Sequence, residues 1–192
     1  MSNLPQTLNY KIIGTAPLLT HNGQLADPLN PFAKEMKKIS GKRAKVEADF
    51  EQLARLEWRG SLYMSEGRPA LPGEMIEATI VGGAKKQRKG KVARAAVFCD
   101  HPVFLDYDGP KDPDEMWADP KYRYTCGVRV QQSRVMRTRP IFRKWSAKVE
   151  LAVLDEEVEA DDVTRFFADA GRYVGLGDYR PKFGRFRVER VA

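Results

Sequence analysis

The apolar pattern of residues 145–174 constrains the fold of this chain more than any other feature. Trp145–Val153 alternates apolar side chains with polar or charged ones, which is the period of a strand with one buried face. The acidic pair at 161–162 then begins a segment whose apolar residues recur at i, i+3, i+4, i+7 and i+11, as in an amphipathic helix. Gly175 ends this helix, and Phe186–Val191 follows as a strand. These residues predict a strand, a helix and a strand built around one core.

The same two periods occur earlier in the chain. Leu8–Thr15 is predicted to form a strand, because its apolar residues favour a pleated, partly buried surface. Glu74–Lys86 is predicted to form a helix with one apolar face. Val128–Met136 is predicted to be a strand that pairs antiparallel with Trp145–Val153 through the connection around Pro140. Without insertions the order is β-α-β-β-α-β, which predicts an α+β fold of the ferredoxin-like (RRM-like) type, a scaffold that RNA-recognition domains also use.

The length of 192 residues predicts a single domain spanning residues 1–192. Insertions are expected at about 16–70 and 90–127, where prolines, asparagines and aspartates indicate long surface loops. The first insertion also contains a predicted amphipathic helix, Val46–Trp58. The apolar side chains that we expect on its buried face are Val46, Phe50, Leu53 and Ala54.

Positive charge is concentrated in two acid-free runs. The chain has 33 Lys and Arg against 26 Asp and Glu, a net charge of +7. Pro120–Val149 and Ala78–Phe98 contain no acidic residue and many basic ones, whereas Asp155–Asp162 is strongly acidic. This segregation indicates a polyanionic partner on one face of the protein. The alternative is a solvated basic surface without a partner.

Other features favour a cytoplasmic protein without a bound cofactor. The longest apolar runs fall far below the roughly 18 residues that a membrane span needs, and the N-terminus has no signal-peptide pattern, so we expect no membrane partner. Cys99 and Cys126 lack a neighbouring Cys or His at zinc-site spacing, which predicts reduced structural thiols and no metal. His21 and His101 are too far apart in sequence to indicate a ligand pair.

The stretch Gly175–Val188 has the residue types of a ligand-binding loop. Its three glycines, Gly175, Gly177 and Gly184, let the backbone approach a ligand closely, and their amides can form an anion-binding concavity. The side chains that add positive charge or could stack on a base are Tyr179, Arg180, Lys182, Phe183, Arg185, Phe186 and Arg187. The alternative is a tight helix-to-strand turn in which the glycines only satisfy backbone geometry.

A second candidate stretch runs from Arg134 to Trp145. On an extended strand Arg137 and Arg139 share a face about 6–7 Å apart, close to the phosphate spacing of a stretched single strand. Phe142 and Trp145 could supply stacking for bases. In the alternative interpretation Trp145 belongs to the core and the arginines are solvated.

Three segments resemble the RAMP superfamily, the ferredoxin-fold proteins of CRISPR systems. Gly175–Val188 is similar to the glycine-rich loop near the C-terminus of those proteins. Arg68–Ala78 resembles the Pro-Gly-rich entry to the first palm helix of the backbone subunits, although Glu74 and Glu77 depart from the usual pattern. Pro17–Pro28 follows the first strand, where backbone subunits carry a loop that faces nucleic acid.

The resemblance implies a subunit that binds the backbone of single-stranded nucleic acid, RNA rather than DNA. It further implies self-association along the strand, in a filament or a multi-subunit ribonucleoprotein of antiviral defence. A likeness to small bacteriophage proteins implies handling of phage nucleic acid instead. The family position makes Asp27 a candidate for RNA cleavage. His21 is the candidate base of a metal-independent endoribonuclease, the first alternative function. The second alternative is a phage structural or interaction protein.

A binding role is favoured over a catalytic one, because the sequence has many candidate contacts and few candidate catalysts. The residues that we expect to contact nucleic acid are Lys85, Lys86, Arg88, Arg134, Arg137, Arg139, Arg143, Lys144, Gly175, Gly177, Tyr179, Arg180, Lys182, Gly184 and Arg185.

Overall fold

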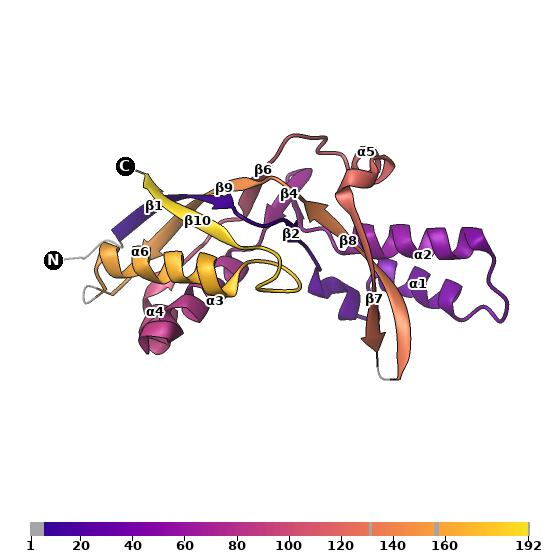
Figure 1. Ribbon diagram of the computed structural model, residues 1–192, viewed down its shortest axis with the longest axis horizontal. Coiled ribbons are helices and arrows are strands. Elements are labelled where there is room, and N and C mark those ends of the chain that lie inside the picture. Colours follow the sequence, from indigo (N-terminus) through magenta and orange to yellow (C-terminus); the bar gives the residue numbers. More distant parts are fainter. Residues whose placement is uncertain (1–5, 131, 156–157, 192) are drawn as a thin grey trace. The chain divides into compact units, whose positions relative to one another are not determined.

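A computed structural model describes residues 6–130, 132–155 and 158–191 (Figure 1). The chain is an α+β protein with antiparallel sheets, and it divides into two compact units. Unit 1 consists of the described residues of Met1–Leu18, Met64–Asp108 and Phe142–Ala192. Unit 2 consists of those of Leu19–Tyr63 and Gly109–Ile141, which overlap the two insertions expected in a single domain.

Unit 1 is built on a seven-stranded antiparallel sheet. The strand order is β10-β1-β9-β6-β4-β3, and β5 pairs with β9 beside β6. The strands are β1 (Gln6–Gly14), β3 (Met64–Ser65), β4 (Arg68–Leu71), β5 (Val97–Phe98), β6 (Val103–Asp106), β9 (Ser146–Val153) and β10 (Phe186–Val191). β1 lies between the two C-terminal strands, with Tyr10 opposite Val149 on β9 and opposite Arg190 on β10.

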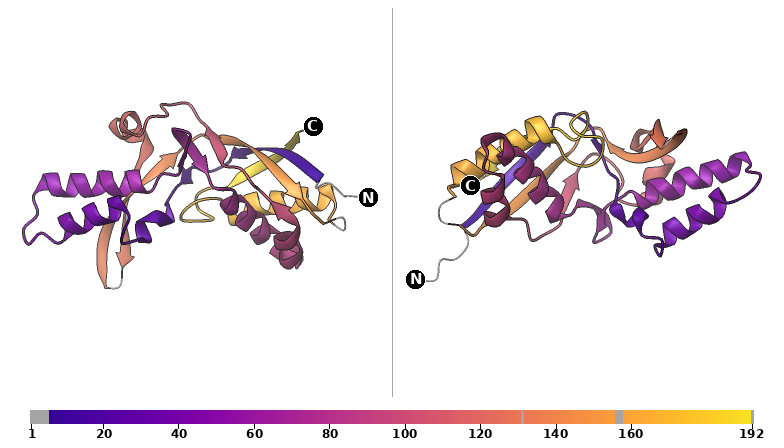
Figure 2. Two further views of the ribbon diagram at one scale, coloured as in Figure 1. Left: turned by 180° about the vertical axis from the view of Figure 1, so that it is seen from behind. Right: turned by 90° about the horizontal axis from the view of Figure 1, so that it is seen from below.

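Helices α3 (Gly73–Ala84) and α6 (Ala160–Asp169) cover one face of this sheet (Figures 1 and 2). α6 continues into a π turn, η4 (Ala170–Val174), and α3 into a short 3-10 turn, η2 (Lys85–Gln87), and helix α4 (Gly90–Ala96). The side chains on the covered face of β1 are buried, and the ring of Tyr10 packs edge-on against Phe167 of α6 at 5.5 Å. The alternation in the strands and the helical period in α6 therefore bury apolar residues on opposite sides of one core.

Close packing of α3 on α6 depends on a glycine. A Cβ placed on Gly83 would lie 2.1 Å from the carbonyl oxygen of Phe166 and 2.5 Å from the backbone nitrogen of Ala170. Real Cβ atoms do not approach backbone so closely, so any side chain at this position would separate the helices. α6 begins as predicted near Asp161, whose neighbour Ala160 is the first helical residue.

The described part of unit 2 combines a helical hairpin and a third, short helix with a small sheet. Helices α1 (Pro31–Ser40) and α2 (Glu47–Gly60) lie side by side as a helical hairpin (Figure 2). The other elements are β2 (Leu18–Leu19), where the chain enters the unit, η1 (Gly23–Ala26), α5 (Pro113–Ala118), η3 (Pro120–Tyr122), β7 (Arg123–Val130) and β8 (Ser133–Phe142). The sheet order is β2-β8-β7.

Two predictions about the strands are wrong. Val128–Met136 is not one strand but parts of two, because the segment pairs with itself: Val128 lies opposite Val135 in the β7–β8 hairpin. The neighbours of β9 are instead β1, β5 and β6, and β6 comes from a stretch that was expected to be a loop. Polar and apolar residues alternate in a two-stranded hairpin just as they do in a strand of a larger sheet. The pattern alone therefore does not distinguish the β7–β8 hairpin from a strand of the unit 1 sheet.

The predicted apolar face of α2 is wrong for two of its four residues, whereas Leu53 and Ala54 are half-buried. Val46 is 65% exposed and Phe50 is 59% exposed, whereas Trp58 and Glu57 at the other end of the helix are buried. The indole Nε1 of Trp58 donates a hydrogen bond of 2.8 Å to the carbonyl oxygen of Tyr122, and its ring packs edge-on against Trp117 at 5.5 Å. The face of α2 that unit 2 covers therefore includes Asp49, Glu57 and Trp58 rather than Val46 and Phe50.

None of the helices in residues 6–130, 132–155 and 158–191 combines the length and the apolarity that a bilayer crossing requires.

The packing of α3 on α6 gives a stability prediction. Gly83→Ala should lower the free energy of unfolding by about 3 kcal/mol, because the added methyl group has only backbone atoms in front of it. Urea denaturation followed by circular dichroism measures this change. Gly23→Ala, with no atom within 4 Å of the added Cβ, is the matched control and should stay within about 0.5 kcal/mol of the parent. Equal effects of the two substitutions would contradict the prediction.

Candidate nucleic-acid interface

The glycine-rich loop between η4 and β10 is held together by its own backbone. Gly175, Gly177 and Gly184 have φ values of 78°, 74° and 73°, in the left-handed region that favours glycine. A Cβ on Gly184 would lie 1.8 Å from the carbonyl oxygen of Leu176. The backbone N–H of Leu176 donates a hydrogen bond of 2.9 Å to the carbonyl oxygen of Gly184. The N–H of Gly184 donates one of 2.7 Å to the carbonyl oxygen of Pro17. Gly175 and Gly184 therefore shape the loop, and their buried amides are used within the chain.

The loop presents an aromatic ring and several cations to solvent. Tyr179 is 58% exposed, and its ring stacks on that of the buried Phe183 at 5.7 Å between centroids. The ammonium group of Lys182 lies 5.6 Å from the Tyr179 ring and 5.9 Å from the Phe183 ring. Arg180 and Arg185 are exposed as well. Within the described residues, none of these three cations forms an ion pair.

Tyr179 is held in an unusual backbone conformation. Its φ of 56° lies in the left-handed region, which non-glycine residues rarely adopt and which costs of the order of 1 kcal/mol. Such conformations persist where the surrounding structure fixes them, and they are concentrated at functional sites. The conformation leaves the ring of Tyr179 outside the loop with one face on Phe183.

The basic segment after α3 is fixed along α6. Lys89 donates a hydrogen bond of 2.9 Å to Asp162, and Gln87 donates one of 2.8 Å to Asp169. The bond from Lys89, together with an ion pair from Arg165, holds the pKa of Asp162 below its usual range against the opposing effect of burial. Lys86 lies over the ring of Tyr173 at 5.2 Å. Of the predicted contacts in this segment, Lys85, Lys86 and Arg88 are all exposed.

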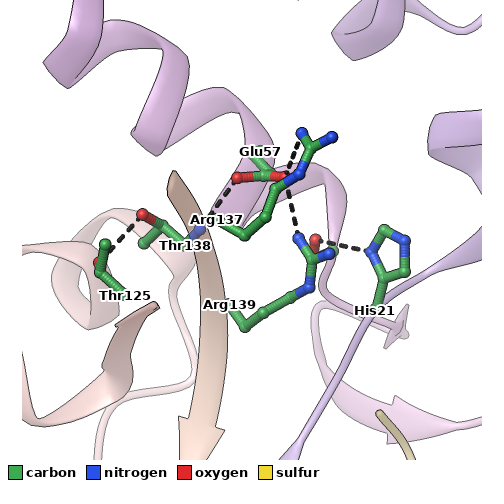
Figure 3. A network of polar contacts seen from close by, with 7 residues as sticks. His21, Glu57, Thr125, Arg137, Thr138 and Arg139 are labelled. Atoms are coloured by element: carbon green, nitrogen blue, oxygen red, sulfur yellow. Dashed lines mark hydrogen bonds and ion pairs between the residues drawn. The ribbon is translucent and has the colours of Figure 1, made fainter. Parts of the chain in front are cut away.

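The arginines of β8 have a different environment, because a buried carboxylate holds two of them (Figure 3). Glu57 of α2 is 5% exposed, and its Oε1 accepts hydrogen bonds from Arg137 at 3.0 Å and from Arg139 at 2.9 Å. Its Oε2 accepts the backbone amide of Thr138 at 2.9 Å. The two arginines share a face of the strand as expected, but their charge is directed into unit 2 and partly neutralised there.

Glu57 was not identified from the sequence. It lies 80 positions before Arg137, and an acid near the end of an amphipathic helix normally belongs to the solvated face. The one local signal is its neighbour Trp58, since a helix that buries an indole there also turns adjacent residues toward the interior.

The predicted stacking residues of this stretch are core residues. Phe142 is 1% exposed and packs edge-on against Tyr107 at 4.9 Å. Trp145 is also buried, and its Nε1 donates a hydrogen bond of 3.0 Å to the carbonyl oxygen of Ala16. The suggestion that Phe142 stacks on bases is therefore wrong, and Trp145 follows the alternative interpretation, in which it belongs to the core. Arg143 and Lys144, in the turn before β9, and Arg134 on β8 are exposed.

The candidate catalytic residues lie in the loop after β2. Nδ1 of His21 is 3.3 Å from the hydroxyl oxygen of Ser61. Asp27 is exposed, and its Oδ1 accepts the backbone amide of Leu29 at 2.8 Å, the geometry of an Asx turn. Among the described residues no group of three or more His, Cys, Asp or Glu side chains is arranged to hold a metal ion. Both residues thus have local roles in the loop.

The predicted contacts fall into two groups. Those at 85–88, 143–144 and 175–185 belong to unit 1, and those at 134–139, with His21 and Asp27, belong to unit 2. No protein-family model matches the chain, and no curated protein matches it either. The candidate interface therefore rests on the geometry within unit 1.

The buried carboxylate of unit 2 gives a second stability prediction. Glu57→Gln should lower the free energy of unfolding by about 2–3 kcal/mol, because it removes the negative charge that two partly buried arginines share. Glu51→Gln, at an exposed position of the same helix, is the control and should change stability little. Thermal and urea unfolding of the two variants measure the difference, and equal stability would show that Glu57 has no such role.

Proposed function

We propose that this protein binds single-stranded nucleic acid, RNA rather than DNA, through the loop Gly175–Arg185. The observation that carries the proposal is the exposed ring of Tyr179, which stacks on Phe183 and has the ammonium group of Lys182 at 5.6 Å. A base can stack on the outer face of the ring, while Arg180, Lys182 and Arg185 contact the phosphates on either side.

The combination of a stacking face and free cations favours a single strand over a duplex. Bases in a duplex already stack on their neighbours, whereas those of a single strand are available to an aromatic side chain. Cations on flexible side chains contact phosphates without reading base edges, so binding of this kind depends little on sequence. The loop backbone is fixed by its internal hydrogen bonds, which lowers the entropy that binding must remove.

The sheet of unit 1 supports the resemblance to the RAMP superfamily. Four strands have the order β10-β1-β9-β6, with α3 between β1 and β6 in sequence and α6 between β9 and β10. A ferredoxin-like β-α-β-β-α-β unit is expected to have such an order, so the order is consistent with the proposal. The glycine-rich loop precedes the last strand of this unit, as in the superfamily. We extend the proposal to repeated subunits along the strand, as the resemblance implies.

Substitution of Tyr179 tests the proposal. Tyr179→Ala should weaken binding of a fluorescently labelled single-stranded RNA about ten-fold, the contribution of one stacked base. Tyr179→Phe keeps the ring and should bind like the parent. Fluorescence anisotropy titrations measure both, and melting temperatures show whether the variants remain folded. Unchanged affinity of a folded Tyr179→Ala variant would contradict the proposal.

Removal of a cation should change the salt dependence of the same titration. Arg180→Ala should reduce the slope of log affinity against log salt by about 0.7, because one fewer phosphate is neutralised. Lys38→Ala, at an exposed position of α1 in unit 2, is the matched charge control and should leave the slope unchanged. Equal slopes for the parent and Arg180→Ala would exclude Arg180 from the interface.

A further inference from the structure

A basic hollow lies where η2 turns into α4 in unit 1. Its volume is about 510 Å³, and it is lined by Lys85, Arg88, Gly90, Lys91, Arg94 and Ala95. Its lining includes four cations and no acid among the described residues. A Cβ on Gly90 would lie 2.6 Å from Cγ of Lys85, so the glycine leaves room for the lysine stem along one wall.

The four cations of the hollow have no ion-pair partner among the described residues. The two nearby acids of α6 already have other partners: Asp162 accepts a hydrogen bond from Lys89, and Asp169 accepts one from Gln87. In the segment from η2 to α4, the side chains of residues 87 and 89 therefore bind α6, whereas the charged side chains that line the hollow are exposed to solvent. Lys85 and Arg94 also line an adjacent hollow that contains Glu74 and Glu77, whereas Arg88 and Lys91 do not. Like charges held together raise the local positive potential and attract an anion.

The backbone of Arg88 gives a second, independent indication of a ligand site. Its backbone N–H donates a hydrogen bond of 3.1 Å to the carbonyl oxygen of Lys85. The N–H of Lys89 donates one of 3.0 Å to the carbonyl oxygen of Ala84. These two bonds form a Schellman motif, and Arg88, with φ of 62°, occupies the left-handed position where glycine is strongly favoured. An arginine at this position sacrifices stability, and its side chain lines the hollow.

We propose that this hollow binds a phosphate monoester, which under the proposed function is the terminal phosphate of the bound strand. A phosphate monoester carries a charge of about −1.5 to −2 at pH 7, since its second pKa is about 6. An internal phosphodiester carries a single negative charge. Four cations around one hollow interact more strongly with the group of higher charge. Arginine also binds phosphate through two parallel N–H donors, which Arg88 and Arg94 can both provide.

The test compares otherwise identical single-stranded oligonucleotides with a 5′-phosphate, a 3′-phosphate or only hydroxyl ends. A phosphorylated end should raise affinity about ten-fold, the contribution of one charge-assisted hydrogen bond. The preference should shrink as the pH falls from 7.5 to 5.5, because the monoester then loses its second charge. The arm that shows the preference identifies which end is bound.

Arg88→Gly separates a binding role from a structural one. The substitution should raise the melting temperature by about 3 °C, because glycine suits the left-handed position, and it should abolish the preference for a phosphorylated end. The affinity for the hydroxyl-ended oligonucleotide should fall much less than the affinity for the phosphorylated one. Lys91→Ala should reduce the end preference without the gain in stability. Lys38→Ala should alter neither property.

The outcomes distinguish this inference from the proposed function on which it rests. Equal affinity for all three oligonucleotides overturns the hollow as a monoester site and leaves binding through Tyr179 intact. If no oligonucleotide binds, the proposed function fails. A melting measurement with a nucleoside 5′-monophosphate then tests the hollow separately. A rise in melting temperature that Arg88→Gly removes supports the phosphate site, and no rise overturns it.

Discussion

The contact between α3 and α6 determines where the surface features of unit 1 lie. Gly83 brings the two helices to backbone contact over the sheet, and both candidate binding features begin at their ends. η2 and α4 follow α3 directly, and the glycine-rich loop follows η4 at the end of α6. Because the helices cannot shift apart without losing the core around Tyr10 and Phe167, the basic hollow and the aromatic loop are fixed by the same packing.

Local patterns predicted elements whose residues contact one another nearby in sequence. The helix near Asp161 and the strand Phe186–Val191 are predicted correctly. Both depend on patterns among residues close in sequence, namely the amphipathic period of the helix and the glycine that ends it. The hairpin β7–β8 was missed, since a ribbon and a palm strand share one period. The error at the start of α2 has a related cause: Val46 and Phe50 match the helical period but are exposed, whereas Asp49 between them is buried.

The candidate interface was predictable in composition and not in geometry. Arginine side chains of β8 have the residue type of phosphate ligands, yet Arg137 and Arg139 are partners of Glu57, a residue 80 positions or more away in sequence. Conversely, Arg88 and Tyr179 gain their significance from positive φ values, which no residue pattern other than glycine announces. Charge counted along a sequence does not distinguish cations that neutralise a buried acid from those that remain in solvent.

The position of β1 has a consequence for synthesis. Its two neighbours in the sheet, β9 and β10, are Ser146–Val153 and Phe186–Val191, so β1 is synthesised well before either of its partners. Both segments of unit 2 are complete by Ile141, before β9 has been made. During translation β1 therefore lacks its partner strands while the segments of unit 2 are completed, and its unpaired backbone groups can pair with other strands during that time.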